Sequence, residues 1–498
     1  MSAKNSDLQG ENRKIPWERL RRLRENVRDV QLRRLRLDAL SCIARGLDAV
    51  RPERVVKDVL RVRGSEIEVR GERFPFQADS LHLLAVGKAA VPMALQAMRL
   101  LPVASGLVVT NQSGMTLGQD GVHLVVGSHP LPSEESLAAA REAIALVDRL
   151  RPNDLLLTLI SGGASAMFEA SPVALRDLRT CYAELLRSGL SIRDINEVRK
   201  GVSEVKGGRL AERALSRGGR VVTLILSDII GDPIEDIGSG PTAPESSRGA
   251  RAEEILRRAN LWNTMPDSVR QRLAEASGGP GAWRDRSGRV HAFVAAGNDR
   301  ACSAARGEAE RRGYAARIWT TSLQGEAREV GPALVSDALR WNPAASSIGV
   351  IAGGETTVTV HGAGRGGRNQ ELALSAAESL EGQAAVLLSF GTDGADGDTD
   401  AAGAIVDGET MIRARALGLD PKQFLDENNS YAFFEALKDH LVTGPTGTNV
   451  ADLIIVLSSR SATSGGRRVS RSVDTRERSK NRRSRRRAPP VRRRPERR

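Results

Sequence analysis

Three turns in the sequence place glycine beside a charged or hydroxyl side chain, in patterns that could bind an anion. Each follows a short apolar run and leads toward a stretch with helical spacing. Backbone N–H groups at such turns lack partners, and the helix dipole adds to their attraction for anionic oxygens. We therefore expect phosphate or carboxylate ligands at these turns. They are Gly87-Lys88-Ala89-Ala90, Ser161-Gly162-Gly163-Ala164-Ser165 and Gly353-Gly354-Glu355.

Lys88 follows a glycine, but it is not part of a P-loop. That motif needs a glycine five residues before the Gly-Lys pair and a Ser or Thr after it. In this chain His82 and Ala89 occupy those two places. Lys88 is therefore a candidate phosphate-binding cation only in combination with other residues.

A fourth loop, residues 362–371, contains the pattern G-x-G-x-x-G and precedes a predicted helix. The pattern is typical of dinucleotide-binding folds, in which an acidic residue about 20 positions later binds the ribose. Here the nearest candidate, Asp393, comes later than that, and the loop carries Arg365 and Arg368. Two arginines favour a more highly charged ligand such as a triphosphate. A dinucleotide-dependent hydroxy-acid dehydrogenase is the alternative interpretation.

Two acidic clusters also follow apolar runs. In a magnesium-nucleotide site, carboxylates hold the metal while cations balance the phosphates, so acidic clusters near basic residues fit such a site. The clusters are Asp228, Asp232, Glu235 and Asp236, and Asp393, Asp396, Asp398 and Asp400.

Of the six histidines, only His361 beside the glycine loop is a candidate site residue.

These candidate residues lie at the ends of short, almost wholly apolar runs, each bounded by small polar residues. A continuous apolar run indicates a strand with both faces buried, which is typical of parallel sheets flanked by helices. Ligands of such sheets bind at the carboxyl ends of the strands, where these polar residues gather. We predict an α/β fold whose sheets are mainly parallel. The runs are residues 83–86, 155–160, 221–226, 293–296, 348–352, 386–389 and 453–457.

The length of 498 residues allows two or three domains. We predict two α/β domains with the active site in the cleft between them, and polar segments at both ends that bury too few apolar groups to fold. The predicted segments are a disordered N-terminus (1–15), an N-terminal domain (16–276), a linker (277–288), a C-terminal domain (289–457) and a disordered Arg-rich tail (458–498).

The net charge of +13 comes from the tail. Residues 458–498 contain 17 Lys/Arg and 3 Asp/Glu, a balance of +14, whereas residues 1–457 contain 57 and 58, a balance of −1. A positive surface suited to nucleic acid is therefore confined to the tail, where binding would be non-specific. A nucleic-acid-associated protein acting through this tail is a third interpretation.

The composition of the chain also indicates the cellular compartment in which it works. No apolar run approaches the roughly 18 residues of a membrane span, and the N-terminus has no apolar signal segment. The three cysteines, Cys42, Cys181 and Cys302, are far apart and indicate neither a disulfide framework nor a zinc site. These features predict a cytoplasmic protein.

Taken in order, nine short motifs between about residues 30 and 457 resemble those of the type-II glycerate kinases, whose C-terminal part is called the MOFRL domain. The motifs are Val86-Gly-Lys-Ala-Ala90, Ile160-Ser-Gly-Gly-Ala-Ser165, Asn196-Glu-Val-Arg-Lys200 with Lys206-Gly-Gly-Arg-Leu-Ala211, Ser227-Asp-Ile-Ile-Gly-Asp232, Ser239-Gly-Pro-Thr242, Gly353-Gly-Glu-Thr356, Gly366-Gly-Arg-Asn-Gln-Glu371, Thr392-Asp-Gly-Ala-Asp-Gly397 and Gly444-Pro-Thr-Gly-Thr-Asn-Val450.

The resemblance implies ATP with Mg²⁺, and phosphorylation of D-glycerate at its 2-hydroxyl. It places the family's catalytic lysine on Lys88 and its catalytic arginine on Arg368, which would neutralise the transferring phosphoryl group. Asp228 would hold Mg²⁺ or accept the hydroxyl proton, and Asp232, Asp393 and Asp396 are the other metal candidates. The expected substrate- or phosphate-binding residues are Ser161, Gly162, Gly163, Ser165, Arg199, Lys206, Gly353, Gly354 and Glu355.

The chain departs from the family pattern in three places. Ala164 stands where the family usually has a third glycine, and Gly201 stands where it usually has a histidine. If that histidine contacts substrate, its loss weakens the substrate assignment more than the kinase assignment. The third departure is the arginine-rich tail, because the family tends to end just after the last strand.

Overall fold

The computed structural model describes residues 15, 17–245, 247–277, 283–341, 343 and 347–459. The predicted disordered segment 1–15 lies outside the described residues except for Ile15, and so does the predicted tail except for Ser458 and Ser459. Those two serines end the last strand, so the strand extends two residues beyond its predicted end. Of the predicted linker 277–288, residues 278–282 lie outside the described residues.

The larger sheet, here called the N-terminal sheet, has six strands, and every neighbouring pair is parallel. This confirms the parallel α/β prediction for this part of the chain. The carboxyl ends of all six strands lie at one edge, which is where Lys88, the turn after residue 160 and Asp228 follow their strands. In sheet order the strands are β6 (Val122–Val126), β5 (Ser105–Thr110), β4 (Leu81–Val86), β7 (Leu155–Ser161), β8 (Arg220–Leu226) and β9 (Val290–Ala296).

Helices cover both faces of the N-terminal sheet. Along β4, Leu83 and Ala85 belong to one buried cluster while Leu84 and Val86 belong to another, as the two-residue period of a strand requires. Helices α3 (Pro52–Val59) and α4 (Ala90–Leu100) pack on one face, and α5 (Glu134–Asp148) and α9 (Arg209–Ser216) pack on the other. This double cover explains why the strands are apolar throughout.

The C-terminal sheet has five strands and is mostly antiparallel, so the prediction of mainly parallel sheets is wrong here. Only β10 and β11 run parallel, because β14 lies between β11 and β12 and runs opposite to both. An apolar run shows that both faces of a strand are buried but not its direction. In sheet order the strands are β10 (Ala315–Leu323), β11 (Ser347–Gly354), β14 (Asp452–Ser459), β12 (Ala385–Gly391) and β13 (Gly403–Asp407).

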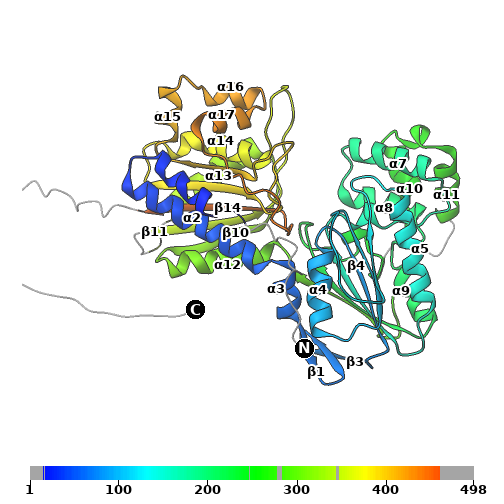
Figure 1. The fold of residues 1–498 in the computed structure, drawn as a ribbon. Helices are drawn as coiled ribbons and strands as arrows, with labels where there is room; N and C mark the ends of the chain where they lie inside the picture. Colours follow the sequence, from blue (N-terminus) through cyan, green and yellow to red (C-terminus); the bar gives the residue numbers. More distant parts are fainter. Residues whose placement is uncertain are drawn as a thin grey trace, which may run out of the picture. The chain divides into compact units, whose positions relative to one another are not determined.

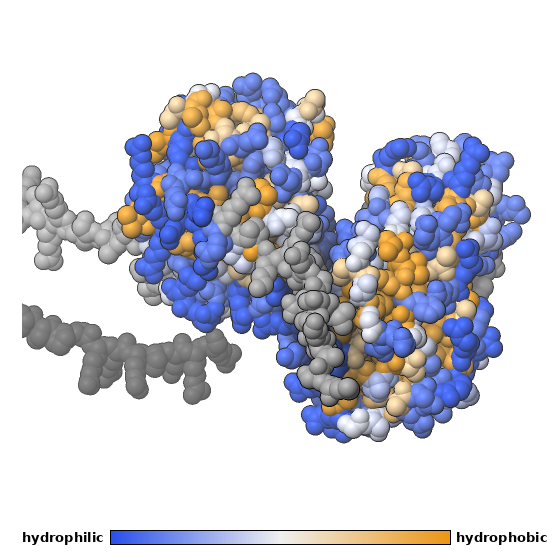
Figure 2. All heavy atoms as spheres, in the orientation of Figure 1, coloured by the Kyte–Doolittle hydropathy of each residue, from blue (hydrophilic) through white to orange (hydrophobic). Residues whose placement is uncertain are grey.

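This sheet is also covered on both faces, as Figure 1 shows. Helices α2 (Val30–Ala49) and α12 (Asn298–Arg311) pack on one face, and α13 (Ala327–Arg340) and α14 (Arg368–Leu380) pack on the other. The side of α2 that is visible in Figure 2 is mostly hydrophilic, in keeping with a solvated arginine-rich face. Arg36 is the exception, because it is buried and forms ion pairs with Asp407 and Asp439.

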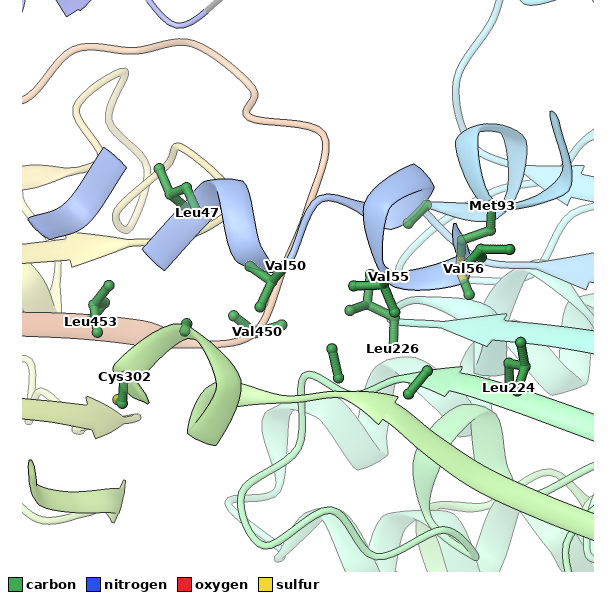
Figure 3. Close-up of a cluster of buried hydrophobic side chains, with 14 of the residues drawn as sticks. Leu47, Val50, Val55, Val56, Met93, Leu224, Leu226, Cys302, Val450 and Leu453 are labelled. Atoms are coloured by element: carbon green, nitrogen blue, oxygen red, sulfur yellow. The ribbon is translucent and has the colours of Figure 1, made fainter. Parts of the chain in front are cut away.

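The predicted domain boundary at 277–288 does not follow the sheets. Strand β9, assigned to the C-terminal domain, pairs with β8 in the N-terminal sheet, and α2, assigned to the N-terminal domain, packs on β12 and β14. One buried cluster contains residues of both sheets, including Leu226 of β8 and Leu453 of β14 (Figure 3). The described residues thus belong to one compact unit in which segments distant in sequence share a core.

The remaining elements form smaller layers. Four helices pack around their own buried cluster beside the N-terminal sheet, and residues 60–75 form an antiparallel three-stranded sheet. No helix in the described part of the chain is long and apolar enough to span a membrane. The elements are α7 (Leu175–Arg187), α8 (Ile192–Val202), α10 (Ala252–Arg258) and α11 (Asp267–Ser277); β1 (Leu60–Arg63), β2 (Glu66–Val69) and β3 (Glu72–Pro75); α1 (Trp17–Arg21), α6 (Ala164–Met167), α15 (Thr410–Ala416), α16 (Pro421–Asp426) and α17 (Ser430–Leu437); and the 3-10 helices η1 (Arg22–Asn26), η2 (Ile237–Ser239) and η3 (Trp262–Thr264).

Candidate active site

The turn that carries Lys88 is locked to the turn after β7. The Lys88 N–H donates to the carbonyl of Gly162 (2.9 Å), and the Ala89 N–H donates to Ser161 Oγ (3.0 Å). Gly87 has φ +127°, and a Cβ there would lie 2.3 Å from Ser161 Oγ, so only glycine fits. Ser161 itself is buried, and its hydroxyl joins the two turns. The Ser161 side chain therefore serves the fold by joining the two turns, and its predicted contact with a ligand stays a prediction.

Gly162 and Gly163 bring three functional side chains together. A Cβ on Gly162 would lie 2.0 Å from a carboxylate oxygen of Asp228, so this carboxylate rests directly on the turn. A Cβ on Gly163 would meet Lys88 Cγ at 3.3 Å and His129 Cδ2 at 3.2 Å. The absence of side chains at these two glycines is what allows Lys88, Asp228 and His129 to gather.

Asp228 is electrostatically unusual. Burial raises the pKa of its carboxyl to about 6, the Lys88 ammonium opposes this rise, and the charge of Asp393 adds to it. The Asn449 side-chain amide donates to the Asp228 carboxylate at 3.4 Å. A carboxylate with a raised pKa in such a setting is suited to accept a proton near neutral pH.

Arg368 is held by two carboxylates at the start of α14. Its Nε and Nη2 donate to the Asp452 carboxylate (2.6 and 3.0 Å), and its Nη1 contacts a Glu355 oxygen at 2.7 Å. Asp452 is 2 % exposed and also accepts from the Asn369 side chain (2.9 Å). The guanidinium is thus fixed in orientation, and its charge is balanced within the protein.

Charged groups of the two sheets act on one another. Burial raises the pKa of Glu355, Arg368 opposes the rise, and the charges of Asp452, Asp228 and Asp393 add to it. Burial also raises the pKa of Asp452, where Arg368 opposes the rise and Asp393 adds to it. Carboxylates from β8, β11, β12 and β14 therefore share one electrostatic environment with Lys88 and Arg368. Asp228 and Asp393 are close enough to interact, and their predicted role in holding a metal ion stays a prediction.

The other two predicted metal ligands, Asp396 and Asp232, have different surroundings, although the charge of Asp396 also acts on Arg368. Asp396 accepts four hydrogen bonds, from the backbone and side-chain nitrogens of Asn369 and Gln370, so the start of α14 uses both its oxygens. Asp232 faces Gly297 instead, where a Cβ would lie 2.6 Å from its carboxylate oxygen. At Asp396 the protein itself therefore occupies both carboxylate oxygens, whereas at Asp232 the carboxylate packs closely against Gly297.

A magnesium ion fits the site only with help from a ligand. Among the described residues no three His, Cys, Asp or Glu side chains are grouped so that they could hold a metal ion alone. Mg²⁺ in nucleotide sites usually takes one or two carboxylates and completes its shell with phosphates and water. Asp228, Asp393 and Glu355 provide such carboxylates. Burial first, and neighbouring carboxylates second, raise the pKa of Asp228 and Glu355, and a bound cation would favour their ionised forms.

Two further expectations about anion binding are wrong. Lys206 is fully buried and donates to Glu169 (2.6 Å) and to the carbonyl of Phe168 (2.8 Å), so no ligand reaches it. Gly353 and Gly354 end strand β11 and pair with β14, and no helix follows them directly. A Cβ on Gly353 would lie 1.9 Å from Asn298 Oδ1, so close packing explains the glycine there.

The G-x-G-x-x-G loop also uses its glycines for internal packing. Cβ atoms on Gly362 and Gly364 would lie 2.2 and 2.5 Å from the carbonyl oxygen of Glu427. A Cβ on Gly367 would lie 2.3 Å from Asp396 Cγ. In a dinucleotide fingerprint the glycines allow the backbone to approach a pyrophosphate. Here they allow it to approach the protein's own chain, which argues against the dehydrogenase interpretation.

Arg199 and His129 form a second part of the site. Arg199 is 6 % exposed, stacks on the Tyr182 ring at 4.8 Å, and has no carboxylate within ion-pair distance among the described residues. Partial burial, followed by the charges of Lys88 and Arg199, lowers the pKa of His129 to about 4. His129 was not predicted as a site residue, because its position beside Gly163 comes from another strand. The His-Pro pair after β6 was the only local signal.

The two departures from the family pattern have packing explanations. Ala164 is the first residue of α6 and has an ordinary helical backbone, so this position does not require glycine. A Cβ on Gly201 would lie 2.5 Å from Leu273 and 3.5 Å from the Ala252 Cβ. Position 201 therefore faces α10 and α11 in this protein, and a histidine there would collide with Leu273. The Gly201 departure alters helix packing and leaves the Lys88 turn untouched.

Comparison with known proteins identifies the family of this chain. The MOFRL family profile matches residues 348–452, and the profile described as a domain of unknown function (DUF4147) matches residues 38–274. Glycerate 2-kinase of Pyrococcus horikoshii is 38% identical over 428 residues, covering 84% of this chain and 96% of that protein. D-glycerate 2-kinase of Thermotoga maritima is 39% identical and covers 84% of this chain and 97% of that protein.

A solved structure gives the same result for the fold. The crystal structure of a glycerate kinase from T. maritima matches with a TM-score of 0.73 at 39% identity, over 84% of this chain and 98% of that chain. The relatives are covered almost completely, and the matches include both sheets. The chain therefore belongs to the glycerate 2-kinase family, with a DUF4147 region followed by a MOFRL domain, as its nine motifs indicated.

Proposed function

We propose that this protein is an ATP-dependent kinase that phosphorylates D-glycerate at its 2-hydroxyl, giving 2-phosphoglycerate. The observation that carries the proposal is that Lys88 and Asp228 lie against adjacent glycines of one turn and interact electrostatically without forming an ion pair. In the described part of the chain, no carboxylate lies within ion-pair distance of the Lys88 ammonium, so its charge is available to a ligand. The names of the relatives support glycerate as the acceptor.

The residues of the site have different roles in phosphoryl transfer. Asp228 accepts the proton of the acceptor hydroxyl, because its raised pKa leaves it ionised yet basic near neutral pH. Lys88 neutralises charge on the transferring phosphoryl group. Arg368 adds N–H donors held in a fixed direction by Asp452 and Glu355. We place the reaction between the edges of the two sheets that carry these groups.

Mg²⁺ would be held by Asp228 or Asp393, with Glu355 as a further carboxylate and the ATP phosphates as remaining ligands. When bound, the ion supplies charge neutralisation for the phosphates. The raised pKa of Asp228 supports this assignment, because an adjacent cation favours the ionised form of a buried carboxylate. Asp396 is left out of this set because the protein itself occupies its oxygens, and Asp232 because the charge that acts on it is that of Asp299 rather than Lys88 or Asp393.

The carboxylate of the acceptor would bind at Arg199 and His129. Arg199 is a buried cation whose Nε has no hydrogen-bond partner among the described residues. Such a group is costly unless an anion compensates it, so a carboxylate ligand stabilises it. A neutral His129 imidazole between Lys88 and Arg199 adds a donor without adding further repulsion between cations.

A coupled assay of ADP release over a panel of small hydroxy acids tests the proposal. We expect D-glycerate with Mg-ATP to give turnover, and the product to be 2-phosphoglycerate by phosphorus NMR. Titration with NAD(H) serves as the control for the dehydrogenase alternative and should show no binding at micromolar concentration. Binding of NAD(H) without binding of Mg-ATP would reverse the choice between the two functions.

Two further predictions concern nucleic-acid binding by the tail and the cellular compartment of the protein. The tail, outside the described residues apart from Ser458 and Ser459, is proposed to bind nucleic acid only non-specifically, because arginine-rich segments attract phosphates without reading bases. The reducing cytoplasm is proposed from the three cysteines, which are all buried and unpaired.

A further inference from the structure

Two buried side chains and the half-buried Ser165 form a hydrogen-bonded series behind the active-site turn. Ser165 Oγ lies 2.8 Å from Ser239 Oγ, and Ser239 Oγ donates to Asn196 Oδ1 at 3.0 Å. The Asn196 side-chain nitrogen donates to the carbonyl of Asp236 at 2.9 Å. Ser239 is fully buried and Asn196 is 1 % exposed, so water does not compete with these bonds.

The chemistry of the three groups determines which of them donates in each hydrogen bond of this series. A backbone carbonyl can only accept, so the bond to Asp236 identifies the Asn196 nitrogen and leaves Asn196 Oδ1 facing Ser239. An amide oxygen cannot donate, so Ser239 must give its single proton to Asn196. The bond between the two serines must therefore be made by the proton of Ser165.

The backbone around Ser239 holds this arrangement in place. Ser239 has φ +59° and lies between Gly238 and Gly240, which both have φ +61°. A left-handed conformation is uncommon for serine and persists only where surrounding contacts favour it. The carbonyl of Ser239 also accepts from the Gly207 N–H at 3.0 Å. The serine is thus fixed both by its side chain and by its backbone.

Ser165 is the half-buried end of this hydrogen-bonded series and lies on α6, two residues after Gly163. A Cβ on Gly163 would meet His129 Cδ2 at 3.2 Å and Lys88 Cγ at 3.3 Å, so Ser165 lies close to the site. Its only proton is committed to Ser239, so its hydroxyl offers lone pairs alone to the site. Lone pairs repel a carboxylate or a phosphate and attract a donor. The expectation that Ser165 binds such an anion does not fit this geometry.

We propose that Ser165 is a specificity residue that accepts a hydrogen bond from a second hydroxyl group of the acceptor, so the site selects acids with two hydroxyl groups. The proposal rests on the proposed function, since it assumes that the acceptor is a small hydroxy acid bound at the Lys88 turn. It assigns the 3-hydroxyl of D-glycerate to Ser165, whereas the reacting 2-hydroxyl faces Asp228.

Binding of three ligands that differ only at the third carbon tests the proposal without requiring turnover. D-Glycerate has a hydroxyl donor there, D-lactate has hydrogen only, and 3-fluoro-D-lactate has a group of similar position that cannot donate. Calorimetry on the full-length protein should give a Kd for D-glycerate about tenfold below that for D-lactate, the effect of one hydrogen bond. The fluorinated ligand should bind no better than D-lactate.

The Ser165→Ala variant should remove this preference. Its Kd for D-glycerate should rise about tenfold, to the value for D-lactate, while the Kd for D-lactate stays within about twofold. Ser216→Ala is the matched control, because the Ser216 hydroxyl is exposed and bonds only to a carbonyl of its own helix. Thermal melting of both variants checks that the fold is intact.

Three results would overturn the proposal: wild type binding 3-fluoro-D-lactate as tightly as D-glycerate, Ser165→Ala weakening all three ligands equally, or wild type binding none of them. The proposed function fails by a separate measurement, the absence of ATP-dependent turnover of D-glycerate. Ligand preference without turnover would keep the role of Ser165 and reject the kinase, and turnover without the preference would do the reverse.

Discussion

The two sheets each contribute a cation to the site, but the two cations are held differently. Lys88, on the N-terminal sheet, is half-buried and has no carboxylate within ion-pair distance in the described part of the chain. Arg368, beside the C-terminal sheet, gives three nitrogens to Asp452 and Glu355. Lys88 therefore brings net positive charge to a ligand, whereas Arg368 brings donors of fixed direction and little net charge. The sequence motifs alone do not reveal this difference between the Lys88 and Arg368 cations.

The strand directions explain this difference. In a parallel sheet every strand delivers its carboxyl end to one edge, so Lys88 and Asp228 follow two strands of the N-terminal sheet at that edge. In the C-terminal sheet, antiparallel β14 brings its first residue, Asp452, opposite Gly354 of β11 and Gly391 of β12. A carboxylate from the start of one strand thereby meets Arg368 near the ends of two others.

Arg368→Ala should have the largest combined effect. We expect kcat to fall by about 10²–10³, because fixed donors to the transferring group are lost. We also expect a loss of stability of about 1–3 kcal/mol, less than for a fully buried pair, because Asp452 and Glu355 lose their partner. Arg368→Lys should restore only part of kcat, since an ammonium cannot make the paired contact with Asp452. Steady-state kinetics and thermal melting measure both effects.

Lys88→Ala should lower kcat as strongly, by about 10²–10³, with a smaller fall in melting temperature than Arg368→Ala. The reason is that Lys88 forms no ion pair among the described residues and acts on Asp228 only at longer range. Lys57→Ala, which removes an exposed lysine of α3, is the matched control and should keep wild-type kinetics. Equal destabilisation by the Lys88 and Arg368 variants would break the comparison, and wild-type turnover in either would remove that residue from the catalytic set.

Asp228→Asn should lower kcat by about 10² and at the same time raise the melting temperature. The pKa of Asp228 is about 6 in the fold against 3.8 in the unfolded chain, so its ionisation costs stability as pH rises through 6. The gain in melting temperature should therefore grow between pH 5 and pH 8. In the wild type, kcat/KM should fall below about pH 6 as Asp228 is protonated. A melting temperature that is lower in the variant at pH 8 would contradict this account.

Removal of the tail should have the smallest effect on catalysis. A chain ending at Ser459 keeps all of β14 and should retain kcat/KM within about threefold, a change under about 1 kcal/mol. Salt-sensitive binding to RNA or heparin should disappear with the tail, because it carries the excess positive charge. Loss of most activity on truncation would show that the tail takes part in the site.

The sequence by itself determined which residues are candidates for the site and which strand each of them follows. The apolar runs predicted seven strands that the structure contains, and the motifs predicted the family. These two predictions succeed because burial of both strand faces and the composition of a turn are local properties that a short segment reveals. The motifs also singled out Lys88, Asp228 and Arg368, whose catalytic roles stay predictions.

Only the tertiary structure decided which candidates are free to meet a ligand. Lys206, Ser161 and Asp396 have the residue types of a binding site, yet each is occupied by a partner that lies at least 26 positions away in the sequence. His129 and the proton direction at Ser165 also depend on such distant neighbours. Hydrogen bonds and ion pairs form in space, so a polar side chain's availability is settled by the fold that surrounds it.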